Sequence, residues 1–401
     1  MGRVFSVALL LATFVTPLRA QDREDGGEVA ASDETPASSE EDASPETVPA
    51  DEEGPSAEAF ASLQEGFGVR SRDGASELRV AGLLAVRGVV SKPPDEDASG
   101  EARVRLGRLA VQGHLADGLI RYFAQLEMAG GVQLLDLEVA LALAPELQIR
   151  VGRIRTPFSR QFLVPLFAQQ LPLRSVVSDY SRAGRDTGLT VEGRAFDGRF
   201  EYRVGAYDER LTDTPLIVGR LAVDPLGPLG YDETTARNPG DPRFSLGVNA
   251  FRGGRQREVR VADPTTGVVT SELAPETLRS AIGFDAAARV GPLGVSAEAF
   301  LGQRSAATGD EAKGAGAFVQ AGVFVLPPHF EIVARYDWLT PDRDTSLRGL
   351  QRGEVGLNLY LLDAHLKVQA SYVYTDVTDA VAAQVPAGSG HLVDLQVLLA
   401  L

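Results

Sequence analysis

The chain has 401 residues, a formal net charge of −16 and no cysteine. Without cysteine, disulfide bonds, thiolate zinc sites and cysteine nucleophiles are excluded. The acidic charge balance argues against nucleic acid as a partner.

The N-terminus has the parts of a secretory signal peptide. Arg3 supplies a positive charge, residues 4–15 form an apolar stretch, and Ala20 ends a plausible cleavage site. This stretch is too short to span a membrane as a helix, and no later run of about 18 apolar residues follows. We therefore expect residues 1–20 to be a signal peptide and the rest of the chain to be exported without a transmembrane helix.

The next segment is strongly acidic. Residues 21–58 contain 14 acidic residues and one arginine, with almost no large apolar side chain. Such a composition cannot bury a core, so we expect a disordered periplasmic linker over residues 21–66. An acidic tether that visits the mouth of a pore is the alternative.

From about residue 75 the chain alternates apolar and polar residues with a period of two, as strands with two different faces do. Near the C-terminus, Val393, Leu395 and Val397 share one face, while Asp394 and Gln396 share the other. The even number of such segments is what a single-chain outer-membrane barrel needs. We expect strands at 77–88, 102–113, 118–129, 132–143, 146–155, 185–195, 198–208, 215–223, 243–252, 278–290, 293–304, 314–326, 329–338, 351–362, 365–376 and 391–401.

These segments predict an all-β protein, a 16-stranded antiparallel transmembrane β-barrel over residues 67–401. Short turns alternate with longer links, so with a periplasmic N-terminus the short turns lie in the periplasm and the longer links outside. Two connections break this pattern: 129–131 is a short outer loop and 224–242 is a long inner turn. The polar inner face, where Asn358 follows Leu357, favours a water-filled channel over a packed core.

The longest outer connection, residues 156–184, is both basic and apolar. Seven arginines between residues 150 and 185 face one acidic residue, Asp179. An exposed loop rarely holds so many leucines and phenylalanines, so we expect this third outer loop to fold into the lumen. Its anchors would be Phe158, Phe162, Leu163 and Phe167.

Arginine rings select anions in pores, and the guanidinium group matches phosphate and carboxylate. We expect Arg160, Arg174 and Arg182 at the narrowest zone. In the alternative, each arginine is paired with a wall carboxylate and the pore is non-selective. The candidate pore-lining residues are Arg121, Arg150, Arg155, Arg160, Arg174, Arg182, Arg185 and Arg203. The candidate opposing carboxylates are Glu127, Asp136 and Glu138.

Residues 151–160, VGRIRTPFSR, resemble the stretch VGQFKTPFSxE of the phosphate-selective porin O and P family. Residues 184–188, GRDTG, are similar to the family's GRDxG entry into the next strand. The resemblance covers about residues 66–401 and implies a sixteen-stranded trimeric channel whose third loop turns inward and which passes anions such as phosphate or polyphosphate. Two positions depart: Arg155 stands where the family usually has lysine, and Leu401 where many barrels end on an aromatic residue.

The favoured interpretation is an outer-membrane porin, not an enzyme, that passes small solutes and prefers anions. Its partners would be small anionic solutes, outer-membrane lipid and further copies of itself in a homotrimer. The four histidines do not pair at metal-ligand spacing, so no metal or cofactor is expected. Two alternatives stay open: a lipid hydrolase that pairs His391 with Ser371 or Ser389, and a non-conducting structural barrel with a plugged lumen.

Overall fold

The computed structural model describes residues 57–62, 66–94, 96–208, 213–234, 239–255, 258–262, 269–273, 277–306, 311–341, 349–377 and 388–401. The expected signal peptide and the linker up to residue 56 lie outside these ranges.

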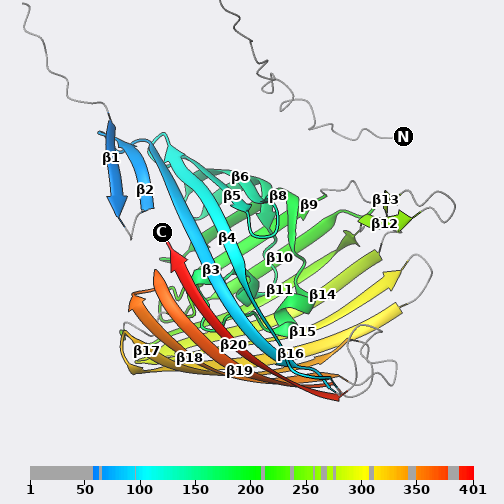
Figure 1. Ribbon diagram of the computed structural model, residues 1–401. Coiled ribbons are helices and arrows are strands. Elements are labelled where there is room, and N and C mark those ends of the chain that lie inside the picture. The colour runs from blue at the N-terminus through cyan, green and yellow to red at the C-terminus, as the bar shows by residue number, and fades with distance from the viewer. Residues whose placement is uncertain are drawn as a thin grey trace, which may run out of the picture. The chain divides into compact units, whose positions relative to one another are not determined.

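Within the described ranges, sixteen antiparallel strands close into a transmembrane β-barrel, and every expected strand is present to within a few residues (Figure 1). Neighbours in the ring follow the order of the chain from β3 to β20. The ring closes because β20 pairs with β3, from His391 opposite Lys92 to Ala400 opposite Leu83. The barrel strands are β3 (Glu77–Lys92), β4 (Ser99–Leu115), β5 (Ile120–Glu127), β6 (Gln133–Ala144), β7 (Leu147–Arg155), β8 (Arg185–Ala195), β9 (Phe200–Tyr207), β10 (Leu216–Val223), β11 (Arg243–Arg255), β14 (Thr277–Val290), β15 (Leu293–Ala306), β16 (Glu311–Leu326), β17 (Phe330–Thr340), β18 (Leu350–Leu362), β19 (Leu366–Val377) and β20 (Gly388–Ala400).

The alternation of the sequence becomes two different surfaces of the barrel wall. Leu357 and Leu395 point outward and are 45% and 53% exposed, whereas Asn358 and Gln396 beside them are 0% and 1% exposed on the inside. An apolar outer band and a polar inner face are what a barrel in lipid requires. The outward orientation expected for the C-terminal strand is confirmed.

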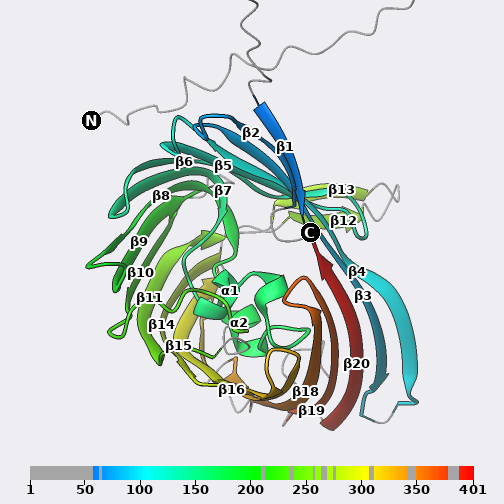
Figure 2. The same ribbon diagram turned by 90° about the vertical axis from the view of Figure 1, so that its left-hand side faces the viewer.

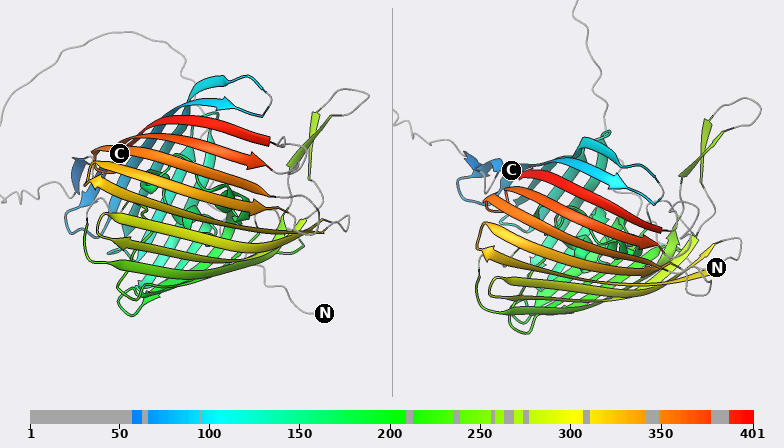
Figure 3. Two further views of the ribbon diagram at one scale, coloured as in Figure 1. Left: turned by 90° about the horizontal axis from the view of Figure 1, so that it is seen from below. Right: turned by 60° about the horizontal axis from the view of Figure 1, so that its bottom comes forward.

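Short turns connect most strands at one end of the barrel, which we call the short-turn end. Longer connections lie at the other end, the long-loop end. The long-loop end carries residues 156–184 and the hairpin of β12 (Glu258–Ala262) and β13 (Val269–Leu273), which stands beyond the barrel strands (Figure 3). Both exceptions to the alternation are present: 128–132 is short at the long-loop end, and 224–242 is long at the short-turn end. None of the helices in the described ranges is long and apolar enough to cross a membrane.

A hairpin outside the barrel corrects the expected boundary of the linker. Residues assigned to the linker form β1 (Ala57–Ser62), which pairs with β2 (Gly66–Ser71), and β2 pairs with the start of β3. Phe60 explains the order of this segment. Its ring lies 5.1 Å from the Arg70 guanidinium and 5.9 Å from that of Arg79, so cation–π contacts tie β1 to β2 and β3.

Candidate functional site

The connection between β7 and β8, residues 156–184, lies inside the ring of strands (Figure 2). It contains the short helices α1 (Arg160–Leu163) and α2 (Val176–Ser181) and the 3-10 turn η1 (Leu166–Ala168). Its two ends are joined at Thr156, whose backbone N–H and hydroxyl both donate to the carbonyl oxygen of Gly184, at 3.0 and 2.8 Å. The loop therefore leaves and re-enters the wall at one point.

Aromatic and aliphatic side chains fix the near part of this loop. Phe158 is 1% exposed and its ring lies edge-on to Phe251, with centroids 4.8 Å apart. Phe162 is also buried, at 2% exposure. Phe167 was expected as an anchor but is 41% exposed. Its neighbour Leu166 takes that role and packs on apolar residues of β3, β4 and β20.

Beyond η1, inward-facing polar side chains of β17–β19 hold the loop. The side-chain nitrogen of Gln170 donates to Glu331 at 2.5 Å, and its backbone carbonyl accepts from Asn358 Nδ2 at 2.7 Å. Lys367 Nζ donates to the carbonyl oxygen of Gln169 at 2.5 Å. Glu331, Asn358 and Lys367 are all 0% exposed. On this side, the polar inner face of the barrel is a docking surface for the loop.

The segment before α2 is held in the same way. Arg335 donates to the carbonyl oxygens of Leu173 at 2.9 Å and Arg174 at 3.3 Å, and Glu354 pairs with Arg335 at 2.5 Å. The hydroxyl of Ser175 donates to Asp337. The segment from Gln169 to Ser175 thus lies against β16–β19, while Leu166 reaches β3, β4 and β20 on the other side.

A second segment enters the lumen from the short-turn end. It follows β10 and comprises residues 224–234 of the long inner turn. The backbone N–H of Glu233 donates to the carbonyl of Ala168 at 3.1 Å. Its carboxylate accepts from the backbone N–H of Gln170 and from the side chain of Gln320, both at 3.0 Å. Glu233 therefore joins the inner turn, the tip of the loop and β16.

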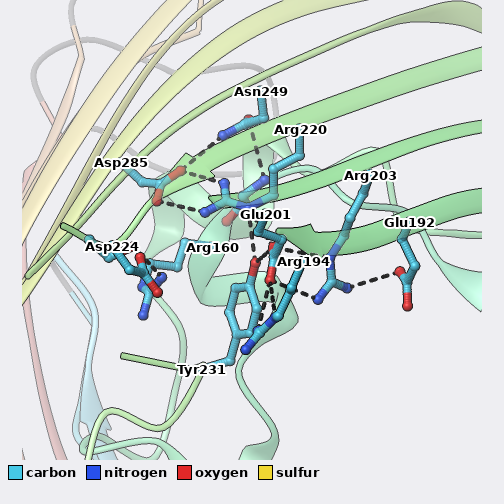
Figure 4. Close-up of polar contacts among 12 residues, drawn as sticks. Arg160, Glu192, Arg194, Glu201, Arg203, Arg220, Asp224, Tyr231, Asn249 and Asp285 are labelled. Carbon is cyan, nitrogen blue, oxygen red and sulfur yellow. Dashed lines mark hydrogen bonds and ion pairs between the residues drawn. The ribbon is translucent and has the colours of Figure 1, made fainter. Parts of the chain in front are cut away.

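Tyr231 lies at the centre of this junction (Figure 4). Its ring centroid is 5.0 Å from the guanidinium of Arg160, 5.2 Å from that of Arg203 and 5.8 Å from that of Arg220. Its hydroxyl donates to Glu201 and accepts from Arg220 Nε at 3.1 Å. Burial raises the pKa of Tyr231, which keeps the phenol protonated as a donor. We call residues 224–234 with Arg160 the clasp, because they connect the loop to β9 and β10.

Replacing Glu233 with Gln should loosen the loop, because the amide keeps one acceptor oxygen where the carboxylate accepts three hydrogen bonds, from Gln161, Gln170 and Gln320. Bonds to a charged acceptor are worth roughly 1.5–3 kcal/mol each. Single-channel recording should show a larger and noisier open-state current. Glu146→Gln, at an exposed turn position of the same end, is the matched control. If both variants gave currents as small and as quiet as those of the parent, the clasp would not control the position of the loop.

Two of the expected pore arginines are neutralised by the expected carboxylates. Arg150 pairs with Glu138 at 2.5 Å and lies 3.3 Å from Glu192. Arg185 forms two hydrogen bonds with Asp136, at 2.8 and 3.0 Å. For these two arginines the structure agrees with the alternative in which each arginine is paired with a wall carboxylate.

Arg160 is placed differently from the expectation. It is 7% exposed and donates to the hydroxyl of Ser245 at 3.3 Å and to the carbonyl of Gly230. It belongs to the clasp and does not face an open passage, because the inner turn covers it. Arg203 pairs with Glu201 at 3.1 Å on the other side of Tyr231.

Two further predicted arginines, Arg182 and Arg121, are more exposed. Arg182 stacks over Phe162 at 5.3 Å and lies 3.3 Å from Asp179, with 39% of its side chain exposed. Arg121 is exposed near the short-turn end and makes no hydrogen bond or ion pair within the part of the chain that the structure describes.

Three arginines bind only uncharged oxygen atoms. Arg155 donates to the carbonyl oxygen of Leu163 at 3.3 Å. Arg174 donates to two loop carbonyls, at 3.2 and 3.3 Å. Arg105 donates to the amide oxygen of Gln396 at 2.7 Å. Within the described ranges, none of the three has a carboxylate in ion-pair contact, so each retains its positive charge in the lumen.

Arg105 and its neighbour Arg108 were missed by sequence reasoning. The register of β3 and β4 shifts at Ala85, so that Arg105 and Arg108 both face the lumen although they are three residues apart. Strict alternation would place them on opposite faces. Arg108 pairs with Glu127, one of the expected carboxylates, at 2.8 Å. The arginines of β4 are visible in the sequence. No sequence pattern, however, indicates the bulge that turns both side chains inward.

The local field around Arg174 is unfavourable for a cation. Burial lowers the pKa of Arg174 to about 9, and the charge of Arg155 adds to this effect. Arg182 and Arg185 contribute further repulsion, which Asp179 offsets only in part. Arg174 stays protonated at neutral pH, and an anion beside it would relieve the repulsion.

The pairing of Ser371 with His391 that a wall hydrolase would need is absent. Ser371 is 5% exposed inside the barrel and donates to Glu354 at 3.0 Å. His391 is exposed on the outside, with Nδ1 2.7 Å from the Tyr372 hydroxyl. In the described ranges no hydrogen bond joins Ser389 to His391, and no group of three or more acidic or histidine side chains could hold a metal ion.

A closed ring of sixteen antiparallel strands with a loop inside it is the architecture of outer-membrane porins. No protein-family model matches the chain, and no curated protein matches it by sequence.

Solved structures with the same fold include an anion-selective porin from Comamonas acidovorans, with a TM-score of 0.58 and 15% identity over 81% of this chain and all of that one. OmpT of Vibrio cholerae has a TM-score of 0.57 and 12% identity, covering 82% of this chain and 98% of its own. OmpF of Salmonella typhi has a TM-score of 0.55 and 12% identity over the same shares. At such identities the similarity shows a shared fold.

Proposed function

We propose that this protein is an outer-membrane porin through which small solutes diffuse, with a preference for anions. Solutes would pass beside the loop, on the side where Arg105 of β4 and Arg155 of β7 line the wall. The observation that carries the proposal is the set of three lumen arginines, Arg105, Arg155 and Arg174, that bind only neutral oxygens.

The energetics favour an anion at this position. At about 4 Å and an effective dielectric near 20, one guanidinium attracts a monovalent anion by roughly 4 kcal/mol before desolvation. The nearby pairs of Arg87 with Asp394 and Arg108 with Glu127 are neutral and leave this surplus intact. Pores that select anions use arginine in this way.

Two similarities support the choice of solute. The name of the Comamonas structure describes an anion-selective porin. Residues 151–160 resemble the phosphate-selective porin O and P family, which supports phosphate-like anions as the preferred solute. Arg155, in the place of that family's usual lysine, would present a fork of donors in place of a point charge.

The same proposal includes location and assembly. The N-terminal signal sequence and the apolar outer band support the outer membrane, with the short-turn end and the acidic N-terminal segment in the periplasm. One of the structures with the same fold is a trimer form of OmpT, with a TM-score of 0.54 and 12% identity. We propose a homotrimer for this chain as well.

A reversal-potential measurement tests the function. The protein is reconstituted in a planar bilayer with different KCl concentrations on the two sides. An anion-preferring pore gives a reversal potential of the sign set by chloride. A potential near zero or of the opposite sign would reject the anion preference, and a barrel without conductance would favour a structural role.

A further inference from the structure

The wall between β4 and β5 is closed along only part of β4. Residues 108–115 of β4 pair with β5, and the backbone N–H of Met128 then donates to the carbonyl of Gly107 at 2.7 Å. There the chain turns through residues 128–132 into β6. The rest of β4, residues 99–106, pairs with β3 on one side, and within the described ranges no strand pairs with its other edge (Figure 3). This part of β4 therefore has a free edge.

The free edge lies at the depth of the apolar outer band. Val104, beside the edge, points outward with 53% of its surface exposed, and its cross-strand neighbour is Val86 of β3. Further toward the long-loop end, Val90 of β3 lies opposite Val393 on the outer face of β20, and both are exposed. Lipid offers no hydrogen-bonding groups, so open sheet edges do not face lipid within the hydrocarbon region. The free edge therefore requires a cover made of protein.

The loop beside the free edge is apolar as well. Met128 and Val132 are 49% and 78% exposed, and two glycines lie between them. Exposed apolar side chains that gather in one patch mark an interaction surface. The hydrogen bond from Met128 to Gly107 joins this loop to the edge. We call residues 99–106 and 128–132 together the notch.

The outer face of β17–β20 differs from the notch in two ways. These strands are paired on both edges, so they present no free backbone groups. They also carry exposed aromatic rings, which are typical of the boundary between lipid and water. These rings are Tyr336, Trp338, Tyr372 and Tyr374. On β4–β6, all of whose residues the structure describes, no aromatic side chain is similarly exposed. One side of the barrel thus fits lipid, and the other fits protein.

We propose that the notch is the surface through which copies of this chain associate. The inference rests on the homotrimer included in the proposed function, and it names the interface of that trimer. A second copy suits the notch because protein can pack on the apolar loop and also supply main-chain partners to a free strand edge. Association would close the part of the wall that β5 and β6 leave low.

Photo-cross-linking in the membrane tests this interface. Val132 of the full chain is replaced with p-benzoylphenylalanine, and outer membranes are irradiated before denaturing gel electrophoresis. The probe should give a band of two linked chains. The same probe at Leu357, which points outward from β18, is the control and should give single chains only. If the probe at Val132 gave single chains from a protein that is a trimer by native mass spectrometry, the notch would not be the interface.

A substitution provides an independent measurement. Val132→Asp should lower the fraction of trimer in mild detergent about tenfold, because the interface would bury an unpaired carboxylate. Phe196→Asp is the matched control, because Phe196 is an exposed apolar residue in a turn of the short-turn end. It should leave the trimer fraction unchanged. Equal trimer fractions from the two variants would overturn the inference.

These outcomes are distinguishable from those of the proposed function. A trimer whose chains cross-link through another face rejects the notch and leaves the homotrimer intact. A protein that is monomeric throughout rejects the homotrimer together with the notch. In either case the reversal potential still decides the anion preference, because it measures the lumen of each barrel and not the contact between copies.

Discussion

Leu357→Arg should prevent assembly of the barrel. Leu357 points outward from the middle of β18 and is 45% exposed to the lipid side. An arginine on the lipid face near the midplane costs about 2–4 kcal/mol. The yield of folded barrel, measured by heat-modifiable migration in gels, should fall to a small fraction of that of the parent.

Gln148→Arg is the control, because Gln148 lies opposite Glu192 on the lumen face of β7. Glu192 pairs with Arg150 and Arg203, so this position already tolerates guanidinium groups nearby. Gln148→Arg should assemble normally. Normal assembly of Leu357→Arg would mean that this part of the wall does not face lipid.

The double substitution Arg155→Gln and Arg174→Gln should abolish most of the anion preference. Both guanidinium groups bind only neutral oxygens, and each could attract an anion by roughly 4 kcal/mol. The reversal potential in a KCl gradient should move toward the cation side, while the conductance stays similar or rises. Arg103→Gln, which removes an exposed charge at the long-loop end, should leave the potential unchanged.

A second comparison separates charge from position. Arg160→Gln also removes one positive charge, but Arg160 is buried in the clasp under Tyr231. It should change the noise of the current more than its ion preference. If the Arg155 and Arg174 variant kept the parental reversal potential, other lumen groups would set the selectivity.

The strands could be predicted because each one alternates apolar residues that face lipid with residues that face the lumen. Lipid demands apolar residues at every second position, so the period alone places the wall and even the two irregular connections. No such pattern marks the hairpin of β1 and β2, where Phe60 of β1 contacts Arg70 of β2 and Arg79 of β3. No sequence pattern indicates the bulge at Ala85 either, and this bulge turns Arg105 into the lumen.

The partners of the loop could not be predicted, because they lie far along the chain. A polar residue at an inward position is compatible with water or with a docked loop. The pattern alone would allow an arginine at position 358, yet Asn358 is 0% exposed and donates to the carbonyl of Gln170. The same ambiguity hid the clasp, because nothing near Arg160 in the sequence indicates Tyr231.

The separation of these partners has a consequence for the order of assembly. Gln369 donates to the carbonyl of Gln170 across 199 positions of the chain, and Arg87 reaches Asp394 across 307. The loop is synthesised well before β17–β19, which hold it, and contacts between such distant segments form late because closing long loops is costly in entropy. The width of the channel is therefore set only when the last strands have paired. A chain that stops before β19 lacks both the pairing of β20 with β3 that closes the wall and the contacts of Lys367 and Gln369 that hold the loop.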